Sequence, residues 1–282
     1  MANVFSVDVE DYFQVEAFSS IVSRSDWDGY PSRVEANTQR ILELLARHKV
    51  RGTFFVLGWV ARRHPALVRE IASHGHEIAS HGMTHRLVYT QTQAEFRAET
   101  IASKKLLEDQ CQQAVVGYRA ATYSITKKSL WALDILCEAG FHYDSSIFPV
   151  WHDKYGIPDA PRLPYRLQTP GGQEIVEFPI TVLERGRLRV PIAGGGYFRL
   201  FPYLFSHWAL KSVNHEGQDF VFYTHPWEVD PDQPRMNNAS LPSRFRHYLN
   251  LHRCEARLNR LLGDFQFETM HANLRRVGLL AI

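Results

Sequence analysis

The sequence predicts one α/β domain folded as a (β/α) barrel, and three observations support this. Strand-like and helix-like segments alternate along the first half of the chain, which indicates parallel strands joined by crossover helices. Polar residues stand directly after the predicted strands, where a barrel has its active face. The chain has 282 residues, of which 45% are hydrophobic and 12% aromatic, enough to bury the core of one barrel.

The first elements follow from local pattern. Residues 4–9 mix β-branched and aromatic side chains and are predicted as a strand that runs into acidic residues. Residues 34–49 have apolar side chains at helical spacing, and Gly52 leads into a strand at 53–57. Pro65 begins a helix through residue 71, which Gly75 stops before a strand at 77–80. The order repeats with a helix at 93–108, a strand at 115–118, a helix at 126–139 and a strand at 141–143.

The second half is less regular. Residues 149–202 are rich in Pro and Gly and are predicted as loops with short strands, one of them at 175–178, that shape a substrate groove. Residues 194–197 are predicted as a tight turn, because no phosphate-binding helix pattern follows the glycines. A strand at 221–223 ends before His225, and residues 241–262 are predicted as one amphipathic helix. The whole chain, 1–282, is predicted as a single domain in which 241–282 form a C-terminal helical extension packed on the barrel.

Composition narrows the classes of function and partner. A net charge of +2 gives no reason to expect nucleic acid. The three cysteines, Cys111, Cys137 and Cys254, lie far apart, which indicates a reducing compartment rather than disulfides or a thiolate zinc site. Neither a signal peptide nor an apolar run of roughly 18 to 20 residues is found, so we expect a cytoplasmic protein without a transmembrane segment. The basic face of helix 241–262 is either solvated or a peripheral contact with the inner membrane, and the oligomeric state stays open.

The chemistry is indicated by residues at the predicted strand ends. His81 and His85 are spaced i, i+4 after the strand at 77–80, and on one helical turn both would face a single metal ion. With 14 histidines in the chain, the spacing alone arises easily by chance. Two histidines and a carboxylate can hold a divalent ion with open positions, which suits hydrolysis of an amide or ester. The full strand-end set is Asp8, Glu10, Asp11, His81, His85, Arg119, Asp144 and His225.

Five short motifs in order give the chain a family resemblance. They are Ser6-Val7-Asp8-Val9-Glu10-Asp11, His81-Gly82-Met83-Thr84-His85, Tyr118-Arg119-Ala120-Ala121-Thr122-Tyr123, Tyr143-Asp144-Ser145-Ser146 and Phe222-Tyr223-Thr224-His225-Pro226-Trp227. With them the chain resembles the polysaccharide deacetylase (NodB-homology) family of carbohydrate esterases, and in particular the branch associated with bacterial exopolysaccharide synthesis and the exosortase system. The resemblance implies a distorted (β/α) barrel that uses a divalent metal, with zinc as the leading candidate, to remove N-acetyl groups from an amino-sugar-containing glycan and release acetate.

The resemblance also implies a role for each site residue. Asp8 would be the general base, and Arg119 would pair with it and hold it ionised. His81 and His85 would be metal ligands, with Glu10 favoured as the third ligand and Asp11 as its alternative. His225 would be the general acid that protonates the departing amine. Asp144 would either tune the pKa of His225 or bind sugar hydroxyls.

Some features leave alternatives open. Many family members have Pro-Pro-Tyr-Gly where this chain has Ala120-Ala121-Thr122-Tyr123, so the backbone N–H that would stabilise the oxyanion lies near either Thr122 or Tyr123. Trp27, Trp151 and Trp227 would either stack on sugar faces or pack in the core. Two rival functions are a hydrolase of another C–N bond, such as a cyclic imide or ureide, and a glycan-binding barrel without turnover.

Overall fold

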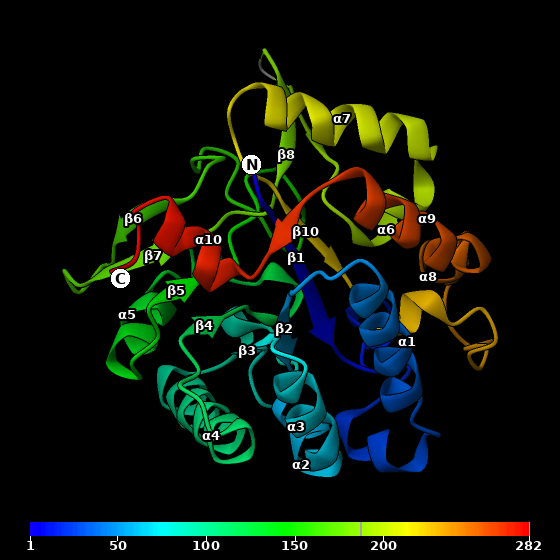
Figure 1. The fold of residues 1–282 in the computed structure, drawn as a ribbon. Helices are drawn as coiled ribbons and strands as arrows, with labels where there is room; N and C mark the ends of the chain where they lie inside the picture. The colour runs from blue at the N-terminus through cyan, green and yellow to red at the C-terminus, as the bar shows by residue number, and fades with distance from the viewer. Residues whose placement is uncertain (187, 282) are drawn as a thin grey trace.

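The computed structural model of the protein describes residues 1–186 and 188–281 and is built on a curled nine-stranded sheet (Figure 1). Hydrogen-bonded neighbours follow the order β10-β1-β2-β3-β4-β5-β7-β6, and β11 also pairs with β1. The pairs are parallel except for β6 with β7. The strands of this sheet are β1 (Asn3–Val9), β2 (Thr53–Val56), β3 (Glu77–Ser80), β4 (Gly117–Tyr118), β5 (Tyr143–Asp144), β6 (Tyr165–Gln168), β7 (Glu174–Glu177), β10 (Val221–Thr224) and β11 (Phe267–Glu268).

The predicted (β/α) barrel is confirmed, and the sheet order shows how it is distorted. The path of paired strands ends at β10 on one side and at β6 on the other, so the described strands curl without closing a ring of hydrogen bonds. A separate antiparallel hairpin, β8 (Val182–Arg185) with β9 (Leu188–Pro191), follows β7 in the chain. Because neighbouring strands from β10 through β5 are parallel, their carboxyl ends meet at one rim, as the sequence predicts.

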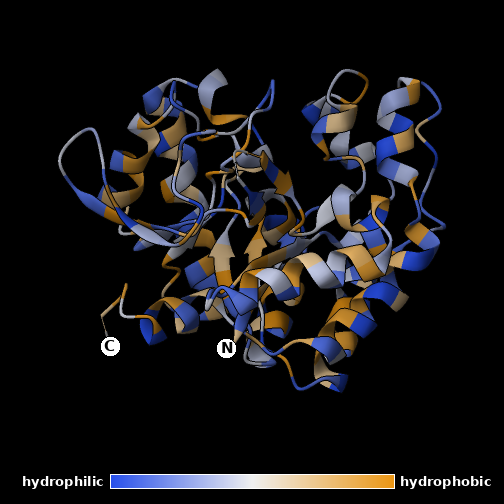
Figure 2. Ribbon diagram, turned by 90° about the horizontal axis from the view of Figure 1, so that it is seen from above, coloured by the Kyte–Doolittle hydropathy of each residue, from blue (hydrophilic) through white to orange (hydrophobic). Residues whose placement is uncertain are grey.

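Helices lie around the sheet (Figure 1), and hydrophobic residues alternate with hydrophilic ones along them (Figure 2), as expected for helices with one buried face. None of the helices in the described ranges combines the length and the apolar character needed to cross a bilayer. The helices are α1 (Val34–Arg47), α2 (Gly58–Arg63), α3 (Pro65–Ser73), α4 (Gln93–Cys111), α5 (Trp131–Glu138), α6 (Gly195–Leu200), α7 (Tyr203–His215), α8 (Leu241–Tyr248), α9 (Leu251–Asp264) and α10 (Met270–Arg276).

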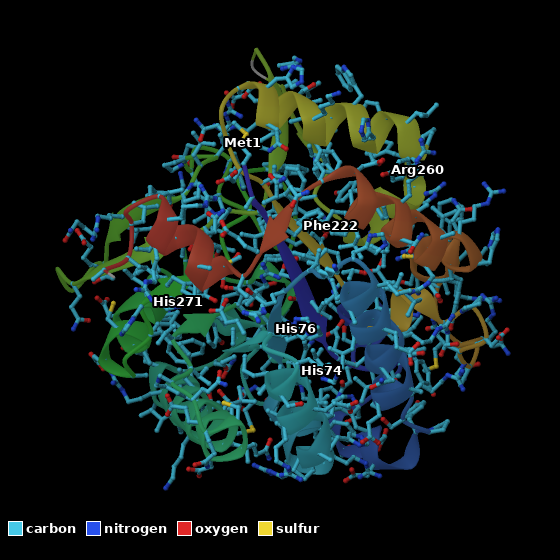
Figure 3. All side chains as sticks on the ribbon, in the orientation of Figure 1. Met1, His74, His76, Phe222, Arg260 and His271 are labelled. Carbon is cyan, nitrogen blue, oxygen red and sulfur yellow. The ribbon has the colours of Figure 1, made fainter. Side chains whose placement is uncertain are left out.

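Strand β1 lies between β10 and β2 and also pairs with β11, and all seven of its residues are buried. Phe5 stacks on Phe222 of β10 at 5.8 Å between ring centroids, and Phe222 contacts Phe198 of α6 edge-on at 4.8 Å. Phe222, labelled in Figure 3, therefore links the sheet to α6 through these ring contacts. Strand β10 is also paired with β1 through Thr224, the residue before His225.

The predicted helix at 241–262 is wrong in one respect, because the structure has two helices there. The chain leaves the helix at Leu249, and Asn250 takes a left-handed conformation with φ of +53° before α9 begins. The extension after residue 241 also contains β11, which pairs with β1 and so belongs to the main sheet. Periodicity could not show the break, because apolar residues continue at helical spacing across it.

Two further predictions differ from the structure. Residues 126–130 form a turn in which the N–H of Thr126 donates to the hydroxyl of Ser129 at 2.9 Å, so α5 begins only at Trp131. The glycines at 194–196 are not only a turn, because they lead into α6. Gly194 has φ of +134°, and a Cβ atom on it would lie 1.9 Å from the carbonyl oxygen of Tyr223. Only glycine lets these two backbones approach so closely.

Candidate metal centre and active site

The site is built at the carboxyl ends of four parallel strands. Asp8 and Glu10 lie at the end of β1, His81 follows β3, and Arg119 follows β4. His225 follows β10, which pairs with β1 in register. All five side chains are buried or nearly so, which is unusual for charged groups unless they pair or bind a ligand.

Glu10, His81 and His85 form a group that could hold a metal ion. One ligand atom from each lies within 4.8 Å of the others, and all three residues are buried. Nε2 of His85 is 2.7 Å from Oε2 of Glu10. Even so, no described residue donates a hydrogen bond of good geometry to this buried oxygen. A buried carboxylate oxygen without a donor needs another partner, and a divalent cation held by two imidazoles fits this donor set.

The second nitrogen of His81 is also accounted for. Nδ1 lies 2.8 Å from the carbonyl oxygen of Arg119, so it carries the proton and donates it there. Burial lowers the pKa of His81 to about 4, which keeps the imidazole neutral near pH 7. A neutral ring whose Nδ1–H is bonded to a carbonyl has Nε2 available as a ligand, the usual arrangement around protein-bound metals.

His85 reaches the group from a loop. The predicted helical turn for His81 and His85 is wrong, because residues 81–87 are irregular and both Gly82 and His85 have left-handed backbones, with φ of +73° and +53°. Arg24 holds this loop by donating to the carbonyl oxygens of Thr84 at 2.7 Å and His85 at 2.8 Å. A left-handed histidine is a strained conformation of the kind that collects at functional sites.

The structure places Glu10 rather than Asp11 with the two histidines. Oδ2 of Asp11 accepts hydrogen bonds from the hydroxyl of Ser32 at 2.7 Å and from the backbone N–H groups of Arg33 at 2.9 Å and Val34 at 3.2 Å. Asp11 therefore holds the beginning of α1. Burial by itself raises the pKa of Glu10, but the facing His85, His225 and His81 lower it to about 2.

Asp8 and Arg119 form a buried ion pair beside this group. Nη1 of Arg119 donates to Oδ1 of Asp8 at 2.7 Å and to the hydroxyl of Ser6 at 2.9 Å. Nε and Nη2 donate to the carbonyl and hydroxyl oxygens of Ser145 at 3.2 and 3.0 Å. The guanidinium also lies 4.0 Å from the ring centroid of Phe55. These contacts fix the direction of the Asp8 carboxylate.

His225 faces the same centre. Its Nε2 is 3.7 Å from Oε1 of Glu10 and 4.0 Å from Oδ2 of Asp8. Its Nδ1 is 2.6 Å from Oε1 of Glu228. Burial by itself lowers the pKa of His225, but the bond to Glu228 and the charges of Glu10 and Asp8 raise it to about 9. Sequence reasoning gave Glu228 no role, although its position three residues after His225 on a short turn was the available signal.

Asp144 is not among the hydrogen-bond or ion-pair partners of His225, and its predicted role, tuning that histidine or binding sugar hydroxyls, stays a prediction. It is fully buried, accepts hydrogen bonds from the hydroxyl of Ser146 at 2.6 Å and its N–H at 3.2 Å, and faces the Glu177 carboxyl. Burial raises the pKa of Asp144 to about 6 and that of Glu177 well above its ordinary value. Asp144 therefore belongs to a carboxyl pair in the interior behind Arg119.

The backbone after Arg119 is strained at the two positions expected near an oxyanion. Thr122 and Tyr123 both have left-handed conformations, with φ of +54° and +53°. The N–H of Tyr123 donates to the carbonyl of Ala120 at 3.0 Å, which leaves the N–H of Thr122 as the candidate donor. A tight turn can direct backbone N–H groups toward one side, where they can meet an anion.

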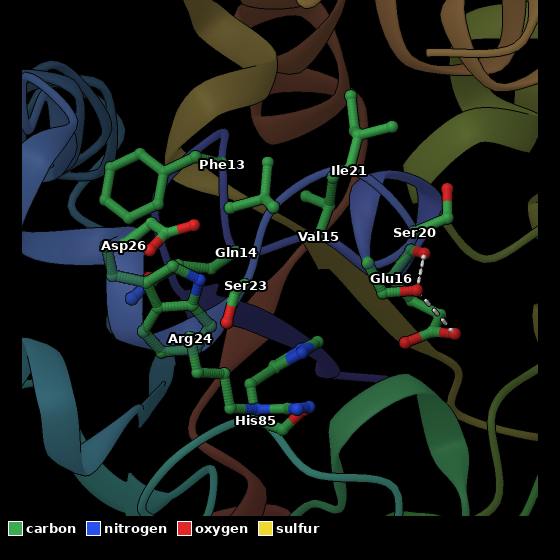
Figure 4. A pocket seen from close by; sticks show the side chains of 13 residues that line it. Phe13, Gln14, Val15, Glu16, Ser20, Ile21, Ser23, Arg24, Asp26 and His85 are labelled. Carbon is green, nitrogen blue, oxygen red and sulfur yellow. Dashed lines mark hydrogen bonds between the residues drawn. The ribbon is translucent and has the colours of Figure 1, made fainter. Parts of the chain in front are cut away.

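Two grooves border this centre. The first, of about 440 Å³, has His85 at its edge together with residues 13–16 and the loop from Ser19 to Trp27 (Figure 4). The second, also about 440 Å³, is lined by aromatic and basic side chains and reaches Tyr223, whose ring is 5.8 Å from that of His225. Its side-chain lining includes His152, Tyr155, Tyr197, Phe245 and Arg246.

The three tryptophans considered for sugar stacking lie in different environments. Trp27 and Trp227 are buried, and Trp227 stacks between His225 and His247 at centroid distances of 5.1 and 4.2 Å. Trp151 is 83% exposed. The core alternative therefore holds for Trp27 and Trp227, and Trp151 alone has a ring face open to a ligand.

Comparison with known families divides the chain in two. Residues 26–143 match the family described as polysaccharide deacetylase. Residues 145–275 match a domain of unknown function (DUF3473). His81, His85 and Arg119 lie in the first part, and His225 and Glu228 lie in the second, so the site described above uses residues from both.

Two of the relatives with similar sequences are named deacetylases. The chain is 33% identical over 99 residues to a chitooligosaccharide deacetylase from Bradyrhizobium sp. (strain ANU 289), a match that covers 35% of this chain and 43% of that protein. It is 32% identical over 71 residues to a peptidoglycan-N-acetylglucosamine deacetylase from Bacillus cereus, covering 25% of this chain and 33% of that protein. The chain thus spans less than half the length of either relative.

Solved structures with a similar fold extend over nearly the whole chain. A protein from Mycobacterium smegmatis described as a polysaccharide deacetylase superposes with a TM-score of 0.64 at 19% identity, covering 98% of this chain and 91% of that one. The Puue allantoinase superposes with a TM-score of 0.63 at 15% identity, covering 99% and 92%. At these identities the likeness concerns the fold, which the two kinds of protein share.

Proposed function

The chain carries a domain of the polysaccharide deacetylase family, and on this basis we propose that it is a metal-dependent hydrolase that removes N-acetyl groups from an amino-sugar-containing glycan and releases acetate. One observation supports this most directly. The buried group of Glu10, His81 and His85 lies next to a fixed carboxylate, Asp8, and an imidazole, His225, which follows the neighbouring strand β10. A ligand set, a base and an acid are the parts that amide hydrolysis needs.

The proposed substrate class follows from the named relatives together with the grooves. Those relatives are named after chitooligosaccharides and peptidoglycan N-acetylglucosamine. The two grooves beside the centre give a polymer room to extend on either side of the reacting sugar. The polymer or its precursor would thus lie across the site, with one acetamido group at the histidines.

A divalent ion, for which we propose zinc, would be held by Glu10, His81 and His85 and would supply an acidified water and a polarised acetyl carbonyl. Asp8 accepts the proton of the attacking water at a carboxylate oxygen. Arg119 keeps that carboxylate in place, because one of its oxygens already accepts the guanidinium hydrogen bond at 2.7 Å. The free oxygen, Oδ2, faces His225 and the site.

His225 completes the reaction at the nitrogen. When the water oxygen has added to the acetyl carbon, the C–N bond can break only if the departing amine receives a proton. Nε2 of His225 would donate that proton, while Nδ1 stays bonded to Glu228. The products are acetate and a free amino sugar, and the proton taken up at Asp8 balances the one released from His225. The N–H of Thr122 would stabilise the negative oxygen of the tetrahedral intermediate.

The test is acetate release from N-acetylglucosamine oligomers by the purified protein loaded with Zn²⁺. We expect release in wild type and a loss of at least about 100-fold in kcat for Asp8→Asn and His225→Ala, as for other positioned acid and base groups. Acetate release that is unchanged in both variants would refute the assigned roles. Binding of the oligomers without any release would favour the glycan-binding barrel.

A rival activity on another C–N bond is favoured by one observation, the fold likeness to the Puue allantoinase. The same preparation should therefore be assayed with a cyclic imide and a cyclic ureide. Turnover of these compounds without acetate release from the oligomers would replace the proposed function by the rival.

We also propose a place for the protein in the cell. Its three cysteines are free thiols, as in proteins of the reducing cytoplasm. Helix α8 exposes Leu241 by 76% and Phe245 by 60% next to Arg244 and Arg246, a combination suited to peripheral contact with the anionic inner membrane. Sedimentation with anionic vesicles should be reduced by Phe245→Ser, and equal sedimentation of the variant would contradict this contact.

A further inference from the structure

Arg199 of α6 is buried at 2% exposure and lies outside every motif that pointed to the site. Its Nε donates to Oε2 of Glu228 at 2.7 Å. Its Nη1 donates to the carbonyl oxygens of His247 at 2.7 Å and Leu249 at 2.8 Å, and Nη2 donates to that of Arg246 at 3.2 Å. One guanidinium thus joins α6 and the break between α8 and α9 to the turn that follows β10.

Glu228 uses both of its carboxylate oxygens. Oε2 is taken by Arg199, while Oε1 lies 2.6 Å from Nδ1 of His225 and also accepts the backbone N–H of His225 at 3.2 Å. The carboxylate is 1% exposed, so water does not compete for it. A carboxylate can only accept a hydrogen bond, so the ring nitrogen that faces Oε1, Nδ1 of His225, must carry a proton.

The ring of His225 is held on its face as well as at its edge. Trp227 stacks on it with an interplanar angle of 20°, and His247 at the end of α8 stacks on the other side of Trp227 at 17°. The indole N–H of Trp227 points to Oε1 of Glu10 at 3.3 Å. The same helix end whose carbonyls bind Arg199 therefore also supports the plane of the imidazole.

We propose that Glu228 and Arg199 are positioning residues for His225, which hold its proton on Nδ1 and direct its Nε2 to the site, and that the domain of unknown function thereby completes the active centre. The inference rests on the function proposed above. Arg199, Glu228 and the carbonyls at the α8–α9 break all lie within residues 145–275. The three proposed metal ligands and the base Asp8 lie before residue 145, so neither part holds the whole site.

The physical reason is that an imidazole has two nitrogens with different tasks. A carboxylate on Nδ1 fixes the tautomer and the ring orientation. Around metal-bound histidines the loss of such a partner typically costs about 10-fold to 100-fold in activity, and we expect a similar loss for His225. Burying the charges of Arg199 and Glu228 costs desolvation energy that can exceed their mutual attraction. Stability alone is therefore a weak explanation for this ion pair. The geometry of this ion pair instead favours a single ring orientation and tautomer of His225.

The test compares three variants of the full chain. For Glu228→Gln and Arg199→Met we expect kcat for acetate release to fall by about 10-fold to 100-fold, with KM and metal content unchanged. The control is Arg257→Met. Arg257 of α9 donates to the carbonyls of Phe198, Arg199 and Phe201 at 2.9 to 3.1 Å but makes no described contact with Glu228, so this variant should keep the kcat of wild type.

A spectroscopic readout on metal-free protein does not depend on activity. The ¹⁵N resonances of the His225 ring should show a protonated Nδ1 in wild type. In Glu228→Gln, Arg199 keeps the amide oxygen, so the amide NH₂ faces Nδ1, which should lose its proton. An unchanged Nδ1 resonance in this variant, or an equal kcat in wild type and Glu228→Gln, would overturn the inference.

The failures can be told apart. If wild type releases no acetate, the proposed function fails. The ¹⁵N resonance of Nδ1 then decides by itself whether Glu228 and Arg199 position His225. If Arg199→Met does not fold, Glu228→Gln decides it, since the isosteric amide keeps the volume and the bond to Arg199. If Arg257→Met loses as much kcat as Arg199→Met, the effect belongs to the helix junction in general and the role of Arg199 is refuted.

Discussion

Replacing Arg119 with methionine would leave Asp8 as an unpaired charge in the interior. Both side chains are almost fully buried, at 0% and 3%, so solvent does not screen the pair. Breaking a buried ion pair from one side costs about 3 to 5 kcal/mol, because the remaining charge stays buried. For a chain of this size the melting temperature should fall by about 5 to 8 °C. We therefore expect Arg119→Met to be folded at 20 °C and clearly destabilised.

The assay is urea unfolding followed by tryptophan fluorescence, with calorimetry as a second probe. The double variant Asp8→Asn with Arg119→Met removes both charges and should recover part of the loss, which separates the unpaired charge from the lost packing. Arg166→Met is the matched surface control, because Arg166 pairs with Glu174 at 2.6 Å but is 49% exposed, and it should cost under about 1 kcal/mol. If Arg119→Met costs no more than this control, or the double variant is no more stable than the single one, the reasoning is refuted.

Three further outcomes are expected. Glu10→Gln should abolish binding of Zn²⁺ measured by calorimetry on metal-free protein, whereas Asp11→Asn should bind it as wild type does and lose stability instead; equal affinities for both variants would contradict the ligand assignment. Burial lowers the pKa of His76 to about 4 from its ordinary 6.5. Between about pH 4 and pH 6.5, His76 is therefore protonated in the unfolded chain but not in the folded protein. The free energy of unfolding should fall as the pH drops through this range. His76→Gln should remove about 3 kcal/mol of that change in urea unfolding, and an unaltered pH dependence would argue against it. Gly117→Ala should lower the free energy of unfolding by about 1 to 3 kcal/mol in the same assay, because the new Cβ would lie 2.1 Å from the buried ring of Tyr143. A variant as stable as wild type would show that the ring can move aside.

The parts of the site that could be predicted from the sequence are those that local pattern encodes. When a strand of β-branched and aromatic residues is followed by a polar residue, that residue is expected at the carboxyl edge of the sheet. This is where Asp8, His81, Arg119 and His225 lie. Parallel order then brings the edges together. The grouping of these residues at one rim required no knowledge of individual contacts.

Other parts depend on contacts between distant segments. The choice between Glu10 and Asp11 is made by Ser32 and the backbone at the start of α1, which bind Asp11 and leave Glu10 to the histidines. The environment of Asp144 depends on Glu177, which strand pairing brings beside it. Spacing along the chain carries no information about either partner, because both lie more than 20 residues away.

The sequence by itself determined the alternation of strands and helices, the order of the motifs and the residues that stand at the rim, since these depend on side-chain period and on chain direction. Only the tertiary structure decided which carboxylate faces the histidines, that Glu228 rather than Asp144 holds His225, and that Arg199 joins this contact to the broken helix near Asn250. The physical reason is that a buried charged group takes the partners that packing leaves within about 3 Å, and packing is a property of the whole fold.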